Sequence, residues 1–175
     1  MEAAPKTQLK MLRPNLDGLP EVQLPSGVSV RQASLEDSVP LAAVLELAFA
    51  EGNWTPERVN RELLQSDDVD STWVLERNGQ IVATCSCQNK NRPGTLGTLH
   101  WVAADPAASG MRLGYWACLV ALQEFARTGY TACNLTTDDP RLPAIKTYFA
   151  LGFEPENAAE DHPERWAKVQ MNLGR

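Results

Sequence analysis

The sequence predicts a mixed α/β (α+β) fold in which helices cover both faces of one central sheet. Strand-like and helix-like segments alternate along the chain, which is typical of this class. The 175 residues are enough for one sizeable core, and contents of 43% apolar and 22% charged residues are typical of globular proteins. We therefore expect an irregular arm over residues 1–26, which holds four prolines, and a single domain over residues 27–175.

Six segments are predicted strands because their residues alternate between apolar and polar or favour extended structure. They are residues 28–32, 72–77, 81–88, 95–104, 130–137 and 165–173. Asn78–Gly79 lies between the second and third of them, and this dipeptide tolerates the positive φ angles of a tight turn. These two segments are therefore expected to pair as an antiparallel hairpin.

Four segments are predicted helices because their apolar residues recur at helical spacing. They are residues 40–51, 56–64, 111–129 and 143–152. Ser34, three residues before Asp37, is typical of a capped helix start, and Thr55 is typical of an N-cap because a proline follows it. Gly129 and Gly152 are expected to end the two later helices.

The composition argues against several classes of partner. A formal net charge of -6 is unfavourable for nucleic acid, which is bound mainly by clustered Lys and Arg, and is better suited to a cationic ligand. No segment approaches the ~20 apolar residues of a membrane span, and the first residues lack the apolar run of a secretory signal. We expect a cytoplasmic protein without membrane or nucleic-acid partners.

Four cysteines are expected to be reduced and buried in the core. They are Cys85, Cys87, Cys118 and Cys133. The first two lie two residues apart in a predicted strand, with neither a CxxC pair nor nearby histidines to complete a zinc site. We therefore expect no bound metal.

The junction between the strand 95–104 and the next helix carries the first chemical signal, the segment DPAASGMRLG at residues 105–114. Gly110 and Gly114 allow a ligand to approach the backbone where a helix presents unpaired N–H groups and the positive end of its dipole. The glycine spacing matches neither the dinucleotide signature nor the lysine-bearing nucleotide loop. A pyrophosphate site and a simple tight turn are the two interpretations.

The same segment resembles the acetyl-CoA-binding motif of the GNAT superfamily of N-acetyltransferases, Arg or Gln, two residues, Gly, one residue, then Gly or Ala. Ser109 and Arg112 depart from the first two positions, and Gly114 matches the third. The backbone N–H groups remain, and the Arg112 guanidinium is able to supply positive charge to phosphate. The resemblance implies a mostly antiparallel sheet of six or seven strands and a coenzyme site formed by Val102, Ala103, Ala104, Ser109, Gly110, Met111, Arg112, Leu113, Gly114, Tyr115 and Arg141.

A second block, residues 144–153, resembles the later motif of this family, with Ala144, then Tyr148, then Gly152-Phe153. In the family a tyrosine at this place lies beside the coenzyme sulfur and acts as general acid. A phenol pKa of ~10 keeps the proton available at neutral pH. Tyr148 is therefore the predicted acid; an aromatic side chain on the buried face of a helix is the other interpretation. Arg141 stands where relatives have Asn, and either contacts the coenzyme or only begins the helix.

The resemblance also implies where the remaining catalytic groups lie. A backbone N–H between Val102 and Ala104 is expected to stabilise the oxyanion. On the same strand His100 is similar in position to a histidine of the arylalkylamine branch, with Thr98 at the partner position, and its unperturbed pKa of ~6.5 suits a base. Strand alternation predicts Thr98, His100, Val102 and Ala104 in one row. A histidine bonded within the sheet is the other interpretation.

Other candidates remain open. Glu51, Glu57 and Asp138 are alternative bases, or simply carboxylates at helix ends and in loops. Trp54 lies between the two early helices, where the family builds its acceptor pocket, and either contacts the acceptor or packs half-buried.

The resemblance thus implies an acetyl-CoA-dependent N-acyltransferase. The expected acceptor is a primary amine of a small molecule or peptide, which attacks the thioester directly, in a monomer or homodimer. The alternative is a catalytically inactive acyl-CoA-binding or interaction module on the same fold, because fold alone does not decide function.

Overall fold

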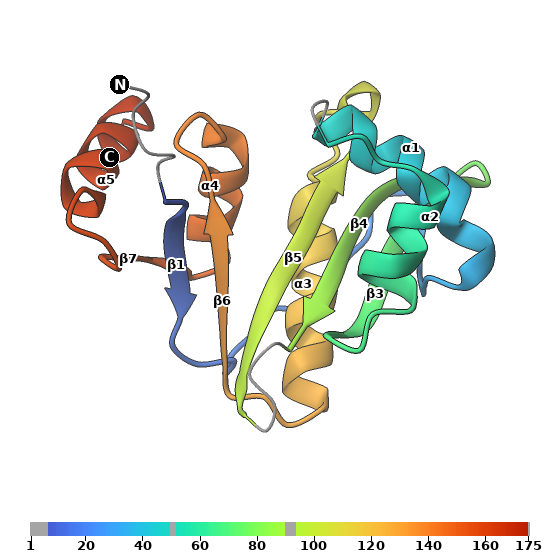
Figure 1. Cartoon of the computed structure of the whole chain (residues 1–175), viewed down its shortest axis with the longest axis horizontal. Coiled ribbons are helices and arrows are strands. Elements are labelled where there is room, and N and C mark those ends of the chain that lie inside the picture. The colour runs from blue at the N-terminus through green and yellow to red at the C-terminus, as the bar shows by residue number, and fades with distance from the viewer. Residues whose placement is uncertain (1–6, 50–51, 90–93, 175) are drawn as a thin grey trace.

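The computed structural model describes residues 7–49, 52–89 and 94–174, and these form one twisted sheet with helices on both faces (Figure 1). The strands run in the order β2-β3-β4-β5-β6-β1-β7, and only β5 and β6 are parallel neighbours. Their bounds are β1 Leu9–Arg13, β2 Val28–Gln32, β3 Val69–Arg77, β4 Gln80–Gln88, β5 Leu96–Ala104, β6 Ala132–Thr137 and β7 Glu154–Glu156. The predicted mixed, mostly antiparallel sheet is therefore confirmed.

Five α-helices lie in the described segments and enclose two apolar cores. They are α1 Ser38–Ala48, α2 Pro56–Val59, α3 Leu113–Arg127, α4 Leu142–Ala150 and α5 His162–Asn172, and a π-helical turn, Asn60–Leu64, continues α2. α1 and α2 pack with one face of β3 to β5 around a smaller core. α3, α4 and α5 contribute to the larger core on the other side, which includes all four cysteines as free, buried thiols. The predicted burial of the cysteines is confirmed.

The local signals in the sequence act as expected at most element ends. Asn78 and Gly79 have φ angles of 52° and 75°, so they form the predicted tight turn between β3 and β4. The Thr55 hydroxyl accepts a hydrogen bond of 3.2 Å from the backbone N–H of Arg58 and caps α2. Gly129 and Gly152, with φ angles of 94° and 79°, end α3 and α4 in the left-handed conformation that favours glycine.

The prediction of an irregular N-terminal arm is wrong for residues 9–13, which form β1. This strand lies between β6 and β7, where Leu9 pairs with Thr137 and Met11 with Pro155. Leu9 and Met11 are completely buried. Five residues give little pattern, and the partners of β1 lie near the other end of the chain. Residues 1–6 of the predicted arm lie outside the described residues.

The prediction of a last strand over residues 165–173 is also wrong, because this segment belongs to α5. The segment alternates superficially, but the side chains that the helix buries have the spacing of one helical face. They are His162, Arg165, Trp166 and Val169. Pro163 is in the first turn, where a missing N–H costs nothing.

The sheet opens between β5 and β6. These strands pair only from Leu96 to Thr98, opposite Ala132 to Asn134, and diverge beyond that point (Figure 1). At the vertex the Thr98 hydroxyl donates a 2.6 Å hydrogen bond to Oδ1 of Asn134. Since both strands run toward the open end, the segments that follow them, which lead into α3 and α4, reach this opening.

An ion pair between the buried Asp37 and the partly exposed Arg31 lies at the start of α1. The Asp37 carboxylate accepts hydrogen bonds of 2.7 and 2.8 Å from Arg31 and one of 2.7 Å from the Ser34 N–H. The bonds from Arg31 lower the pKa of Asp37 to about 2, although burial opposes this shift. The folded-state pKa lies below the unfolded value of about 4, so the stabilisation is complete above that pH and is lost as the pH falls through about 2.

We expect Asp37→Asn to lower the free energy of unfolding at pH 7 by about 1–2 kcal/mol, allowing for solvent screening of the partly exposed arginine. The difference from the wild type should shrink as the pH falls below about 4. Urea unfolding between pH 7 and pH 3 measures it. Glu164→Gln, which removes an exposed ion pair with Lys168, should change stability by less than about 0.5 kcal/mol at every pH. A pH-independent effect of Asp37→Asn would contradict the ion-pair explanation.

Candidate active site

Three neighbouring cavities lie at the opening between β5 and β6. The splay cavity is lined by Gln8, Phe49, Leu99, His100, Trp101, Val102, Thr136, Thr137, Asp138, Arg141 and Tyr148. The central cavity is lined by Ala48, Val102, Ala103, Ala104, Gly114, Arg141, Pro143, Ala144, Thr147 and Tyr148. The helix cavity, between α3 and α4, is lined by Arg112, Gly114, Tyr115, Pro143, Lys146, Thr147 and Ala150.

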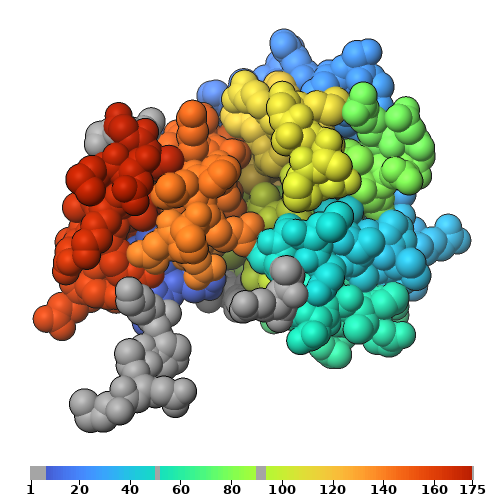
Figure 2. Space-filling view, turned by 90° about the horizontal axis from the view of Figure 1, so that it is seen from above, coloured from blue at the N-terminus to red at the C-terminus, as the bar shows by residue number. Residues whose placement is uncertain are grey.

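The three cavities form one groove because neighbouring cavities share lining residues. Val102, Arg141 and Tyr148 line both the splay and the central cavity. Gly114 and Thr147 line both the central and the helix cavity. Seen from above, α4 (orange), the segment leading into α3 (yellow) and α1 (cyan) surround a recess (Figure 2). A long, narrow ligand is therefore able to run from the helix termini to the interior of the sheet.

A β-bulge in β5 shapes the middle of this groove. Ala103 pairs with Thr84, but His100 pairs with Ser86, so two residues of β5 stand opposite one of β4. Trp101 takes a positive φ of 47° there. Bulged residues leave the regular ladder and re-aim their neighbours. The backbone at Val102 consequently faces the groove, where its carbonyl accepts a 3.4 Å hydrogen bond from Arg141.

The bulge breaks the predicted row of Thr98, His100, Val102 and Ala104, which is therefore wrong. Val102 and Ala104 pack against the core on the α3 side, as Leu99 does. The His100 ring instead stacks on Trp101, with centroids 4.5 Å apart, and Trp101 packs against the core on the α1 side. The predicted alternation assumes that β5 pairs with β4 without interruption, and the sequence contains no signal for the extra residue of the bulge.

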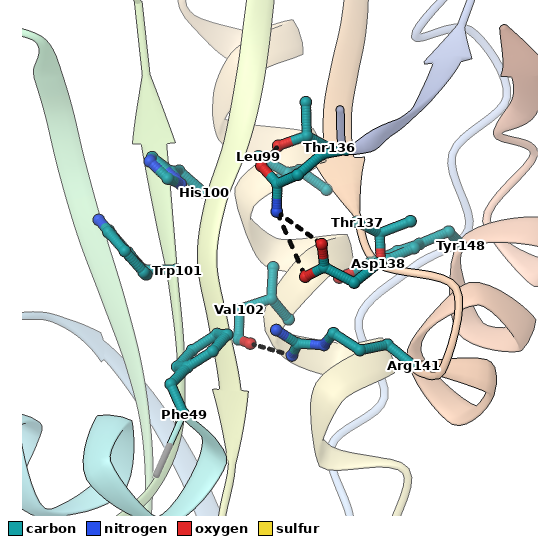
Figure 3. Close-up of a pocket in the computed structure, with 11 residues that line it drawn as sticks. Phe49, Leu99, His100, Trp101, Val102, Thr136, Thr137, Asp138, Arg141 and Tyr148 are labelled. Atoms are coloured by element: carbon teal, nitrogen blue, oxygen red, sulfur yellow. Dashed lines mark hydrogen bonds between the residues drawn. The ribbon is translucent and has the colours of Figure 1, made fainter. Parts of the chain in front are cut away.

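His100 lies in the splay cavity with Tyr148, but the two side chains point differently. In the close-up the imidazole of His100 and the indole of Trp101 are turned away from Asp138, Arg141 and Tyr148 (Figure 3). Thr98, the predicted partner position, is bonded to Asn134 instead. The role of His100 as base stays a prediction.

Tyr148 lies where the splay and central cavities meet. Its side chain is 4% exposed, and its ring packs edge-to-face on Phe153 at 6.0 Å. Burial raises the pKa of the phenol well above its usual value, and the positive charge of Arg141 opposes this only in part. The hydroxyl therefore keeps its proton at neutral and moderately alkaline pH, as a general acid requires.

Arg141 begins α4 and also reaches into the groove, and its contact with the coenzyme stays a prediction. It is the N-cap of α4, and its guanidinium lies 4.4 Å from the centre of the Phe49 ring. Together with the bond to Val102, this contact carries Arg141 across the opening from one half of the sheet to the other (Figure 3).

The start of α3 forms the cationic end of the groove. Arg112 is the N-cap in a left-handed conformation, with φ of 54°, and its guanidinium lies 4.1 Å from the centre of the Tyr115 ring. Lys146 of α4 adds a second positive charge. Since the N–H groups of a first helical turn have no partner within the helix, this end suits an anion.

The predicted coenzyme residues differ in how they reach the groove. Arg112, Gly114 and Tyr115 line the helix cavity. A Cβ added at Gly114 would meet nothing within 4 Å, so the ligand is able to approach the helix there. Leu113 is buried, and Ser109, Gly110, Met111 and Leu113 are not lining residues of the three cavities. Their contact with the coenzyme stays a prediction.

Of the remaining candidate residues within the described part of the chain, one lines the splay cavity and two do not. Trp54 is 7% exposed and packs edge-to-face behind Trp101 at 4.5 Å, so Trp101 rather than Trp54 lines the cavity. Glu57 is exposed in the first turn of α2. Asp138 lies in the splay cavity, and Glu51 lies outside the described residues.

Several residues of the groove escaped prediction from the sequence. They include Gln8, Phe49, Thr136, Pro143 and Lys146. Lys146 lies two residues before Tyr148 in the second motif, and this position was the available signal. Gln8 has no such signal because it reaches the groove only through the pairing of β1 with β6.

The model of the family described as "Acetyltransferase (GNAT) family" matches residues 41–153, which is more than half of the chain. The chain belongs to the GNAT acetyltransferase family. This match covers most of α1 and all of α2, α3 and α4, and thus most of the groove of this GNAT domain, but neither β1 nor α5.

Two curated relatives of this GNAT chain are mycothiol acetyltransferases. The protein from Frankia alni is 31% identical over 150 residues, which cover 77% of this chain and 45% of the relative. The protein from Kytococcus sedentarius is 32% identical over 146 residues, covering 78% and 48%. The chain thus spans about half the length of these relatives.

Solved structures show the same GNAT fold. A GCN5-related N-acetyltransferase from Sphaerobacter thermophilus has a TM-score of 0.68 at 20% identity, with 86% of this chain and 50% of that chain covered. The PaiA N-acetyltransferase from Thermoplasma acidophilum, solved with coenzyme A, has a TM-score of 0.61 at 15% identity, with 76% of this chain and 93% of that chain covered.

Within the described residues, no helix is both long and apolar enough to cross a membrane.

Proposed function

We propose that this chain is an acetyl-CoA-dependent N-acetyltransferase that transfers the acetyl group to a primary amine by direct attack. The observation that carries the proposal is the single groove in which Tyr148 separates a cationic end from a polar cavity. Such a groove brings a long acyl donor and a small acceptor to the same buried hydroxyl.

The groove fits the parts of acetyl-CoA in order. Arg112, Lys146 and the first-turn N–H groups of α3 offer charge and donors to the phosphates. The central cavity, lined largely by alanine and proline side chains and by the exposed edge of the bulged strand, suits the thinner pantetheine arm. GNAT structures solved with coenzyme A or acetyl-CoA support this choice of donor.

The reaction follows from these positions. The lone pair of a neutral amine attacks the thioester carbonyl, and a backbone N–H between Val102 and Ala104 stabilises the oxyanion. The attacking nitrogen gives up one proton to a base. When the intermediate collapses, the carbon–sulfur bond breaks, Tyr148 donates its proton to the departing thiolate, and the phenolate regains a proton from solvent. No bond to the protein forms. His100 stays the predicted base.

The name of the curated relatives supports a small molecule as the acceptor. Both curated relatives described above are named mycothiol acetyltransferases, after a small molecule. At about 30% identity and half the length, the specific acceptor does not transfer from them.

Coenzyme binding and thiol release together test this proposal. Acetyl-CoA at 100 times its Kd should add about 2.7 kcal/mol of stability and raise Tm by roughly 5–10 °C. Free coenzyme A thiol should then appear in the presence of some members of a primary-amine panel, and secondary alcohols serve as the control. Stabilisation without thiol release on any amine would favour the inactive acyl-CoA-binding module. No stabilisation at all would contradict both functions.

A further inference from the structure

Arg165 of α5 ties together two chain segments that lie beside the splay cavity. Arg165 is 7% exposed, and all three nitrogen atoms of its guanidinium donate hydrogen bonds. Its Nε and Nη2 donate to the Asp139 carboxylate at 3.0 and 2.5 Å, and its Nη1 donates to the Thr7 carbonyl at 2.7 Å and to Asp161 at 3.0 Å. The Arg165 guanidinium thus connects the segment just before β1 to the segment just after β6.

Gln8 and Asp138, the sequence neighbours of Thr7 and Asp139, contact each other in the splay cavity. Gln8, next to Thr7, donates from Nε2 to both carboxylate oxygens of Asp138, next to Asp139, at 3.2 and 3.3 Å (Figure 3). The Gln8 amide oxygen accepts a 3.0 Å hydrogen bond from the Thr136 hydroxyl, which fixes the orientation of the amide. Arg165 therefore positions both members of the Gln8–Asp138 pair.

The partners of the Asp138 carboxylate decide which ligand it is able to bind in the splay cavity. Its partner Gln8 is a neutral amide, and Asp138 is not a member of any described ion pair. A carboxylate has about four lone-pair sites, so it is able to accept further hydrogen bonds from the cavity side. Arg141 lines the same cavity but forms no described ion pair with Asp138. A half-buried carboxylate that is in no ion pair favours a positively charged partner.

We propose that Asp138 binds the ammonium group of the acceptor, and that Arg165 is the positioning residue that brings Gln8 and Asp138 together for this purpose. The acceptor class is a cationic amine, since amines with a pKa of ~10 reach the protein protonated at pH 7. The inference rests on the proposed function, because the ligand of the splay cavity is taken to be the acceptor. Gln8 and Arg165 lie outside residues 41–153 that match the family model, so the contacts that position Asp138 come from elements beyond the matched segment.

Calorimetric titration of the protein–coenzyme A complex tests ammonium binding without requiring turnover. The probes are butylamine, phenethylamine, putrescine and glucosamine, with 1-butanol as the uncharged analogue of the first. Asp138→Asn, which preserves the shape and the contact with Gln8, should weaken binding of the amines by roughly 10-fold or more and leave coenzyme A affinity within about 2-fold. It should not weaken binding of 1-butanol.

A matched pair of variants tests the positioning role of Arg165. Asp139→Asn and Asp161→Asn each remove one carboxylate from Arg165, but only Asp139 adjoins Asp138. Asp139→Asn should weaken amine binding by roughly 3- to 10-fold, and Asp161→Asn by less than about 2-fold. Equal effects of the two variants on amine affinity would show a role in folding only, and Tm measured for both reports that role separately.

The outcomes distinguish this inference from the proposed function. Amine binding that depends on Asp138 but produces no thiol with acetyl-CoA supports the ammonium site and contradicts acetyl transfer. Acetyl transfer with an amine affinity that is unchanged in Asp138→Asn supports the proposed function and overturns the ammonium site. Failure of all four amines to bind would also overturn it.

Discussion

Replacing Tyr148 with Phe is expected to lower kcat by roughly 100-fold or more, with the coenzyme affinity changed by less than about 3-fold. The substitution removes only the hydroxyl, and the ring keeps its buried place against Phe153. Burial raises the pKa of this phenol, so the proton that the thiolate needs is present throughout the neutral range. Without it, coenzyme A must leave as a thiolate that no group in this position protonates.

Steady-state kinetics with the best amine, together with calorimetric binding of coenzyme A, measure the two effects. Tyr130→Phe is the matched control, because its hydroxyl bonds to Asp70 in a different cavity beside the far end of α3. This variant should retain kcat within about 2-fold. A parallel loss of kcat and coenzyme affinity in Tyr148→Phe would instead indicate a role in binding and would exclude the role as acid.

Most of the sheet could be predicted because its strands carry their own signals. The β3–β4 hairpin has a turn dipeptide, and α3 and α4 end at glycines with positive φ. β1 could not be found in this way because its stability comes from Thr137 and Pro155, residues that only the fold brings beside it. α5 shows the opposite problem, since its sequence is compatible with two periods and burial selects the helical one.

The site residues likewise fall into those that local sequence predicts and those that only the fold brings into place. Tyr148 was predicted because the second motif carries it, and Arg141 and Val102 because they lie just before the two motifs. The structure brings all three into one groove. The orientation of His100 depends on the bulge at Trp101, which is a property of pairing with β4 rather than of local sequence. The polar wall of the splay cavity, formed by Gln8, depends on contacts between the two ends of the chain. Motifs thus predict the donor side of the groove better than the acceptor side.

Gly114→Val is expected to weaken coenzyme binding by at least roughly 10-fold while the protein remains as stable as the wild type or becomes more stable. The position lies in the first turn of α3 and lines both the central and the helix cavity. A Cβ there contacts no protein atom within 4 Å, so the new side chain projects into the groove rather than into the core. Replacing a helical glycine also gains up to about 1 kcal/mol because the unfolded chain loses conformational freedom.

Gly114→Ala and Gly110→Ala make this prediction specific. The smaller methyl of Gly114→Ala should weaken coenzyme binding less than valine does, in proportion to the volume that it occupies. Gly110 has a φ of 87°, so Gly110→Ala should instead cost about 1 kcal/mol of stability through backbone strain. Calorimetry with coenzyme A and thermal unfolding of the three variants separate these effects. If Gly114→Val bound coenzyme A as tightly as the wild type, the ligand would have to follow another path over the protein than the groove between α3 and α4.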